Sequence, residues 1–150
     1  MTYLKIVSGR SLVNIDTINV FTLWIDTLSW CNDYLSPSRC TYKDVIAGQL
    51  QNSVPADIAQ EFIIAYEPVW AIGTGKVPTN ADIEEVFNLI REGLGSFSNI
   101  DAATVSILYG GSANGGNCEE LSAIPGLGGY LVGSASLKPD EFTKLINSLA

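Results

Sequence analysis

Histidine is absent from this chain of 150 residues. The one side chain that ordinarily titrates near neutral pH is therefore unavailable for acid–base chemistry or metal binding. Cysteine is scarce as well: Cys31, Cys40 and Cys118 are widely spaced, and no pair has the spacing of a zinc site. An odd number of scattered cysteines is typical of free thiols in a reducing compartment. We therefore expect no metal site.

Positive charge is also in short supply. Eight lysines and arginines stand against sixteen acidic residues, which gives a formal net charge of −8. Such an excess argues against a nucleic-acid partner or an anionic membrane surface. It leaves room for a small anionic ligand, because backbone amides can hold an anion locally.

Long apolar runs and targeting signals are missing too. No apolar run approaches the ~18 residues that a membrane-spanning helix needs. The first 20 residues are interrupted by Ser8, Arg10, Asn14 and Asp16, so no basic-then-apolar signal is present. We expect a cytoplasmic protein that has no membrane partner.

Apolar residues, by contrast, make up 47 % of the chain, and the length predicts a single globular domain over residues 1–150. Unbroken apolar segments at 62–67, 104–109 and 129–133 have the pattern of buried strands. Each strand is followed by a loop and then by a helical segment. Three such repeats predict an α/β fold with a parallel sheet, either covered on both faces or closed as a barrel.

The helical segments carry their own signals. Residues 79–95 form an amphipathic pattern, with Thr79 or Asn80 as the cap and Ile83, Val86, Phe87, Ile90 and Leu94 on the apolar face. A short helix is expected over 118–124. The C-terminal tail is predicted to be helical, with these residues pointing inward: Phe142, Leu145, Ile146 and Leu149.

The first 44 residues are harder to assign. Residues 3–9 have the pattern of a strand and residues 11–21 that of a helix. Residues 22–44 have no clear period, and no element is assigned to them.

Each of the three predicted strands ends in a loop suited to a chemical task. Glu67 ends the first strand and opens onto a loop rich in proline and glycine, a typical place for a catalytic base. The second loop contains Tyr109 to Ser112, whose glycines let a ligand approach the backbone. The third contains Gly133 to Ser136, whose amides could face an anion. A carboxylate beside such loops suggests proton abstraction from a small phosphorylated metabolite.

Simpler interpretations exist for each feature. A glutamate at a strand end is more often a solvated loop residue, and a lone glycine pair is usually a tight turn. The "GTGK" stretch does not fit a phosphate-binding loop motif, because Trp70 stands where the first glycine is required and Val77 follows Lys76.

The order and spacing of three motifs are more specific. "AYEPVWAIGTGK" (65–76), "ILYGGS" (107–112) and "LVGSASLKPDEF" (131–142) together closely resemble the triosephosphate isomerase family, over about residues 45–150. The resemblance implies a partial (β/α)8 TIM barrel in which the last three βα units are present. It also implies interconversion of dihydroxyacetone phosphate and glyceraldehyde 3-phosphate through an enediol, in glycolysis and gluconeogenesis. A homodimer and no cofactor are implied as well.

The resemblance also implies roles for individual residues. Glu67 would be the base, Pro68 to Lys76 the mobile lid, and Tyr109 the residue that steadies the closed lid. Four residues would hold the phosphate: Gly73, Ser112, Gly133 and Ser134. Ser134 stands where glycine is common in the family, but a backbone N–H contact survives that change.

Two elements of the family are not found in the sequence. The Asn-x-Lys after the first strand is missing from "YLKIVSGRSLVNID", and the histidine after the fourth strand has no counterpart. A large internal deletion or a shift of reading frame before about Val45 would explain both. The alternative function is therefore a truncated, catalytically impaired remnant that at best binds phosphate. Pairing of two copies into one barrel, or a different phosphate-binding barrel, explains the sequence less well.

Overall fold

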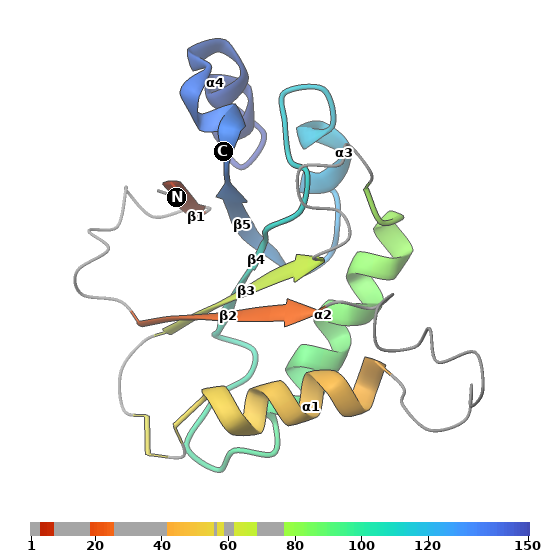
Figure 1. The fold of residues 1–150 in the computed structure, drawn as a ribbon, viewed down its shortest axis with the longest axis vertical. Helices are drawn as coiled ribbons and strands as arrows, with labels where there is room; N and C mark the ends of the chain where they lie inside the picture. Colours follow the sequence, from red (N-terminus) through yellow and green to blue (C-terminus); the bar gives the residue numbers. More distant parts are fainter. Residues whose placement is uncertain (1–3, 8–18, 26–41, 56, 59–61, 69–76) are drawn as a thin grey trace.

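The computed structural model describes residues 4–7, 19–25, 42–55, 57–58, 62–68 and 77–150. These residues form one five-stranded sheet with helices packed against it (Figure 1). The strands are β1 (Leu4–Val7), β2 (Asn19–Ile25), β3 (Phe62–Pro68), β4 (Ser106–Tyr109) and β5 (Leu127–Val132). The helices are α1 (Tyr42–Ser53), α2 (Asn80–Leu94), α3 (Cys118–Ser122), the 3-10 helix η3 (Ser134–Leu137) and α4 (Pro139–Asn147).

The sheet has the strand order β1-β5-β4-β3-β2, and the four strands from β2 to β5 are parallel. Each of the three predicted strands exists and is followed by helical structure, which confirms the α/β repeats. β4 begins later than predicted because Thr104 is drawn into a turn, in which its N–H donates to the carbonyl of Asp101 at 3.0 Å. β5 begins two residues early at Leu127. At Gly128 the two strands approach so closely that a Cβ would stand 3.0 Å from the backbone nitrogen of Ile107.

β1 confirms the strand expected near the N-terminus but runs the wrong way for a barrel. It pairs with β5 in an antiparallel register, from Leu4 opposite Val132 to Val7 opposite Gly129. All strands of a TIM barrel are parallel, so β1 departs from the barrel that the family resemblance implies. The β5 edge can be satisfied by hydrogen bonds from a strand of either direction, and the motif at 3–9 does not specify which.

β2 corrects the helix that was predicted over 11–21. Residues 19–21 belong to a strand that continues to Ile25, while 11–18 lie outside the described residues. The segment "NVFTLWI" is rich in β-branched and aromatic residues, which favour strands. It pairs with β3 along its whole length, from Asn19 opposite Phe62 to Ile25 opposite Pro68.

Helices α1 and α2 lie side by side on one face of the sheet (Figure 1). Gly93 permits this close approach, because a Cβ there would lie 2.5 Å from Cδ1 of Leu50. The strands alternate between two faces. Ile64 and Tyr66 join the core under the helices, whereas Ile63 belongs to a smaller buried cluster on the opposite face with Ala65, Leu108 and Leu131.

The helix signals in the sequence are largely confirmed. Thr79 caps α2 in a reciprocal capping box with Asp82, and all five residues predicted to lie on its apolar face are buried. In α4 only Leu145 is fully buried, while Phe142 is partly buried against the core, as is Leu149 just beyond the end of the helix. Ile146 was expected to point inward but is 42 % exposed. α4 is nine residues long and buries a narrow stripe, and Ile146 lies outside it.

Candidate active site

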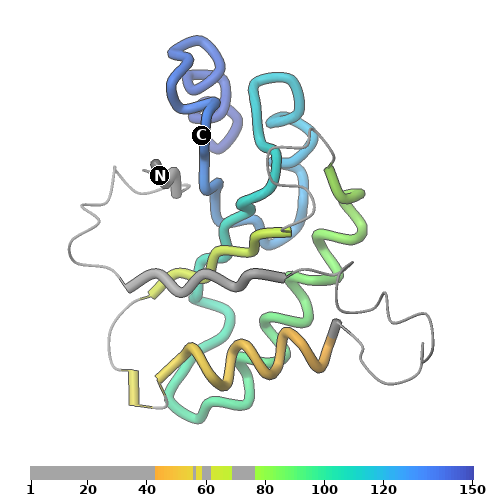
Figure 2. The backbone as a smooth tube through the Cα atoms, in the orientation of Figure 1, coloured from red at the N-terminus to blue at the C-terminus, as the bar shows by residue number. Residues whose placement is uncertain are grey.

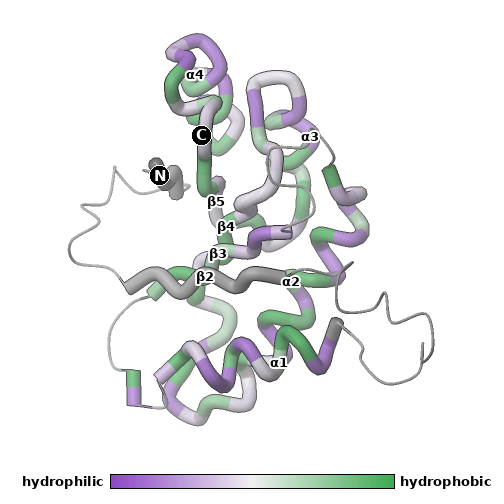
Figure 3. Tube along the Cα trace, in the orientation of Figure 1, coloured by the Kyte–Doolittle hydropathy of each residue, from purple (hydrophilic) through white to green (hydrophobic). Residues whose placement is uncertain are grey.

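Glu67 lies at the carboxyl end of β3, where the strand changes from hydrophobic to hydrophilic (Figure 3). Its residue is only 2 % exposed, so it is not a solvated loop residue. Loss of water around the carboxylate raises the pKa of Glu67, because burial penalises the charged form. Among the residues that the structure describes, we find no hydrogen bond or ion pair to this carboxylate. Such a group holds a proton more readily than an exposed glutamate does.

The loop after β4 lies directly against Glu67. The N–H of Gly110 donates to the carbonyl oxygen of Tyr66 at 2.8 Å, which ties the start of the loop to β3. A Cβ on Gly110 would stand 2.5 Å from Cγ of Glu67 and 3.3 Å from that carbonyl. Only glycine leaves room here for the carboxylate side chain. The structure therefore brings the first and second sequence motifs into contact.

Tyr109 is fully buried at the end of β4, and burial raises the pKa of its hydroxyl. Its ring lies 6.2 Å from that of Tyr66, and its hydroxyl lies over Gly111, 2.2 Å from where a Cβ would stand. Within the described part of the chain this hydroxyl has no hydrogen-bond partner. Leaving such a group unpaired costs roughly 1–3 kcal/mol, so it is suited to donate to a group that arrives there.

The lid predicted over Pro68 to Lys76 falls almost wholly outside the described residues. Pro68 ends β3, whereas 69–76, including Gly73, lie outside the described residues. The support of a lid by Tyr109 therefore stays a prediction.

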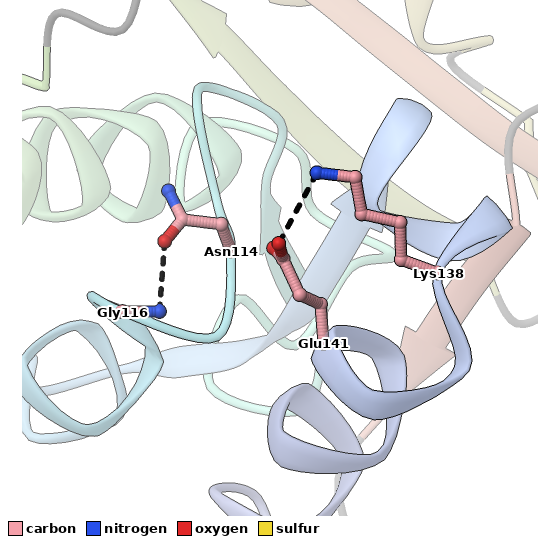
Figure 4. Close-up of polar contacts among 4 residues, drawn as sticks. All are labelled: Asn114, Gly116, Lys138 and Glu141. Carbon is pink, nitrogen blue, oxygen red and sulfur yellow. Dashed lines mark hydrogen bonds and ion pairs between the residues drawn. The ribbon is translucent and has the colours of Figure 1, made fainter.

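Ser112 lies in a loop that is shaped by two asparagines. Its carbonyl oxygen accepts a hydrogen bond from Nδ2 of Asn117 at 2.7 Å. Oδ1 of Asn117 accepts from the N–H of Asn114 at 2.8 Å, and Oδ1 of Asn114 accepts from the N–H of Gly116 at 2.8 Å (Figure 4). The sequence interpretation did not identify these asparagines. The signal in the sequence was the presence of asparagines in a glycine-rich loop, since asparagine side chains often close turns by bonding to nearby backbone.

Gly133 and Ser134 follow β5, the strand next to β4. The carbonyl of Gly133 accepts bonds from the N–H and the hydroxyl of Ser136, at 3.0 and 2.7 Å, so the chain turns tightly into η3. Gly133 is half-buried and Ser134 is exposed. The loop after β4 and the segment leading to α4 rise on the same side of the molecule (Figure 2). This is expected, because parallel strands have their carboxyl ends at one edge of the sheet.

Two further properties of the described residues bear on function. They contain no group of three or more potential ligands that could hold a metal ion. None of their helices is long and apolar enough to cross a membrane. What they do place together is a desolvated carboxylate, the glycine-bearing loop after β4 and a buried tyrosine hydroxyl. The loop after β5 begins at the same edge of the sheet, because β5 is the parallel neighbour of β4.

Comparison with known proteins agrees with the three motifs. The family model described as triosephosphate isomerase matches residues 30–149. A triosephosphate isomerase of Bradyrhizobium diazoefficiens is 48 % identical over 100 residues, which are 66 % of this chain and 40 % of the relative. One from Chlamydia felis is 46 % identical over 111 residues, covering 72 % of this chain and 43 % of the relative.

A rice relative named cytosolic triosephosphate isomerase is 52 % identical over 87 residues, 57 % of this chain and 34 % of its own length. The chain thus spans less than half the length of these curated relatives. The match over 30–149 covers most of the sequence, including every motif at the carboxyl edge of the sheet. The chain belongs to the triosephosphate isomerase family.

Proposed function

We propose that Glu67 is the base of a triose phosphate isomerisation. Its carboxylate takes a proton from the hydroxymethyl carbon of dihydroxyacetone phosphate, which leaves an enediolate. The hydroxyl proton on that carbon passes to the former carbonyl oxygen by way of the enediol, and return of the abstracted proton to the former carbonyl carbon gives glyceraldehyde 3-phosphate. No atom or electron is gained or lost overall. The observation that carries this proposal is the burial of Glu67 against Gly110, because desolvation makes the carboxylate a better base.

The phosphate of the substrate is proposed to bind at Ser112, Gly133 and Ser134, together with Gly73 outside the described residues. Support comes from the asparagine-shaped loop around Ser112 and from the position of both loops at one edge of the sheet. No cofactor is needed for a proton transfer of this kind. A homodimer and a cytoplasmic location are proposed from the family alone.

A second candidate function is an impaired, phosphate-binding remnant. One observation favours it: the chain has no histidine, and no cationic side chain contacts Glu67 among the described residues. Proton abstraction from carbon requires stabilisation of the developing enolate oxygen. Removing one such donor costs on the order of 10²–10³ in rate. We propose that the chain itself retains the base and the phosphate loops but isomerises slowly.

The two candidates are separated by measuring isomerisation and phosphate binding on the same purified chain. The remnant predicts binding of inorganic phosphate, with a turnover lower than that of a complete relative by at least about 10²–10³. Glu67→Asp should then change the residual turnover little. A turnover close to that of a complete relative, abolished by Glu67→Asp, would show a working enzyme. Absence of phosphate binding would contradict both candidates.

A further inference from the structure

The residue that precedes α3 uses its side chain on the loop before it and not on the helix. Asn117 stands at the N-cap position of α3, where an asparagine side chain ordinarily accepts a hydrogen bond from the first turn. Among the described residues of α3, none donates such a bond to it. Both polar groups of this half-buried side chain are instead bonded to residues 112–114, in the loop after β4.

The bonds of Asn117 act on the backbone around Ser112. Nδ2 donates to the carbonyl oxygen of Ser112 at 2.7 Å, and Oδ1 accepts from the N–H of Asn114 at 2.8 Å. In the same peptide unit as the Ser112 carbonyl, the N–H of Ala113 donates to the carbonyl of Gly111 at 2.9 Å. Because a peptide unit is planar, bonds at its carbonyl and at its N–H together determine its orientation. The peptide unit between Ser112 and Ala113 is therefore held at both of its polar groups.

The same loop is held at its start and at its tip by other contacts. The N–H of Gly110 is bonded to β3 at 2.8 Å. At the tip, a Cβ on Gly115 would stand 3.3 Å from Cα of Glu141, so the tip packs directly on α4. Ser112 lies between these two places and belongs to neither contact. The bond from Asn117 therefore acts on the part of the loop that carries the proposed phosphate contact.

We propose that Asn117 is a positioning residue: it sets the orientation of the peptide unit after Ser112 and so holds Ser112 in place as a phosphate contact. It acts through Ser112 and not on the substrate itself. The consequence for phosphate rests on the proposed function, whereas the two hydrogen bonds do not. Asparagine, aspartate and serine cap a helix about equally well. Replacing Asn117 by aspartate or serine therefore changes the bonds to the loop and leaves α3 with a suitable first residue.

Two aspartate variants separate the bond to Ser112 from the effect of charge. Asn117→Asp keeps an acceptor for the N–H of Asn114 but loses the donor to the Ser112 carbonyl. Asn114→Asp is the matched control, because it adds the same charge to the same loop and keeps the acceptor for the N–H of Gly116. Both added charges should weaken the binding of an anion. Asn117→Asp should weaken it about threefold to tenfold further, which is the effect of one lost hydrogen bond on an equilibrium constant.

The experiment is a titration of the purified full chain with inorganic phosphate, followed by amide NMR, with urea denaturation of each variant. Asn117→Ser adds no charge and is too short for both bonds, so it should also bind phosphate at least about threefold more weakly than the wild type. Hydrogen exchange examines the loop without phosphate. The Ala113 amide should exchange at least about tenfold faster in Asn117→Asp than in Asn114→Asp, because its peptide unit is no longer held at the carbonyl.

The results separate the hydrogen bonds from their consequence. If Asn117→Asp binds phosphate as tightly as Asn114→Asp, or if Asn117→Ser loses unfolding free energy but binds phosphate like the wild type, the positioning role is wrong. If the wild type shows no phosphate-dependent shifts at any concentration, the proposed phosphate site is wrong. In that case the exchange of the Ala113 amide still decides, because equal rates in the two aspartate variants would mean that Asn117 does not fix this peptide unit.

Discussion

The C-terminal region, residues 77–150 with β3, and the N-terminal strands β1 and β2 differ in how well their sequences specify their structure. In the first region, caps, apolar stripes and glycine positions all favour the elements that form. In the second, β1 has the right type but the opposite direction, and β2 replaces the end of a predicted helix. The type of an element can be predicted from its own sequence when the local signals favour the same structure as the packing around it. Strand direction and pairing are decided by partners elsewhere in the chain.

The largest effect should come from the core of the C-terminal region. Ile90 of α2 is fully buried, so Ile90→Ala should lower the free energy of unfolding by about 2–5 kcal/mol. Ile146 of α4 is the matched control, because it is the same residue type at 42 % exposure. Ile146→Ala should change the free energy by less than about 1 kcal/mol. Urea denaturation measures both free energies. Equal losses of unfolding free energy in the two variants would mean that stability does not depend on the burial of these isoleucines.

Glycine substitutions should show an effect of intermediate size. Gly110→Ala places a Cβ 2.5 Å from Cγ of Glu67, so it should cost about 1–3 kcal/mol and displace the carboxylate. Gly48, within α1, has no atom within 4 Å of the corresponding Cβ. Gly48→Ala should therefore stabilise the protein, by roughly 0.5–1 kcal/mol. Thermal unfolding of the two variants in parallel checks this contrast. If Gly110→Ala unfolds at the same temperature as Gly48→Ala, the contrast is wrong.

Hydrogen exchange can sharpen the comparison between the two regions. Ile107 and Leu108 lie in β4, between two strands, whereas Lys5 lies in β1 at the edge of the described sheet. Exchange of the β4 amides should be at least about tenfold slower, because central strands open only with larger parts of the fold. Protection in β1 that equals that in β4 would show that the N-terminal strand is as firmly integrated as the rest.

The smallest expected effect is the pH dependence caused by Glu67. Burial raises its pKa, so between the ordinary pKa and the raised one the folded protein keeps a proton that the unfolded chain has released. This contribution to stability is complete at low pH and is lost as the pH rises through the raised pKa. Glu67→Gln should therefore be more stable than the wild type above that pKa, with the difference shrinking below it. A wild type that is the more stable protein at neutral pH would contradict the burial of this carboxylate.

Several parts of the site could be predicted from the sequence. Glu67 and Tyr109 lie at the ends of apolar strands and Gly110 follows the second, and parallel pairing brings those strand ends together. The turn-closing roles of Asn114 and Asn117 were missed although their bonds lie within the loop. The packing of Gly115 on α4 could not be predicted, because it joins a loop and a helix that are distant in the sequence. The exposure of Ile146 was missed for a related reason: periodicity gives the apolar face of a helix but not how much of it the core covers.

The direction of β1 shows the same limit. A strand of only four residues, such as "LKIV", can pair with a neighbour that runs in either direction, and only the β5 edge and the path of the chain decide between the two. The family relation does not remove this limit, because the curated relatives match the chain mainly over its C-terminal two thirds.

Solvent exchange of the substrate tests the central proposal most directly. Dihydroxyacetone phosphate is incubated with the chain in deuterated water, and loss of the carbon-bound proton next to the carbonyl is followed by NMR. If Glu67 is a base without a complete set of partners, the wild type should exchange this proton slowly and Glu67→Gln should not exchange it above the uncatalysed rate. Exchange at the same rate in both proteins would contradict the assignment of Glu67 as the base.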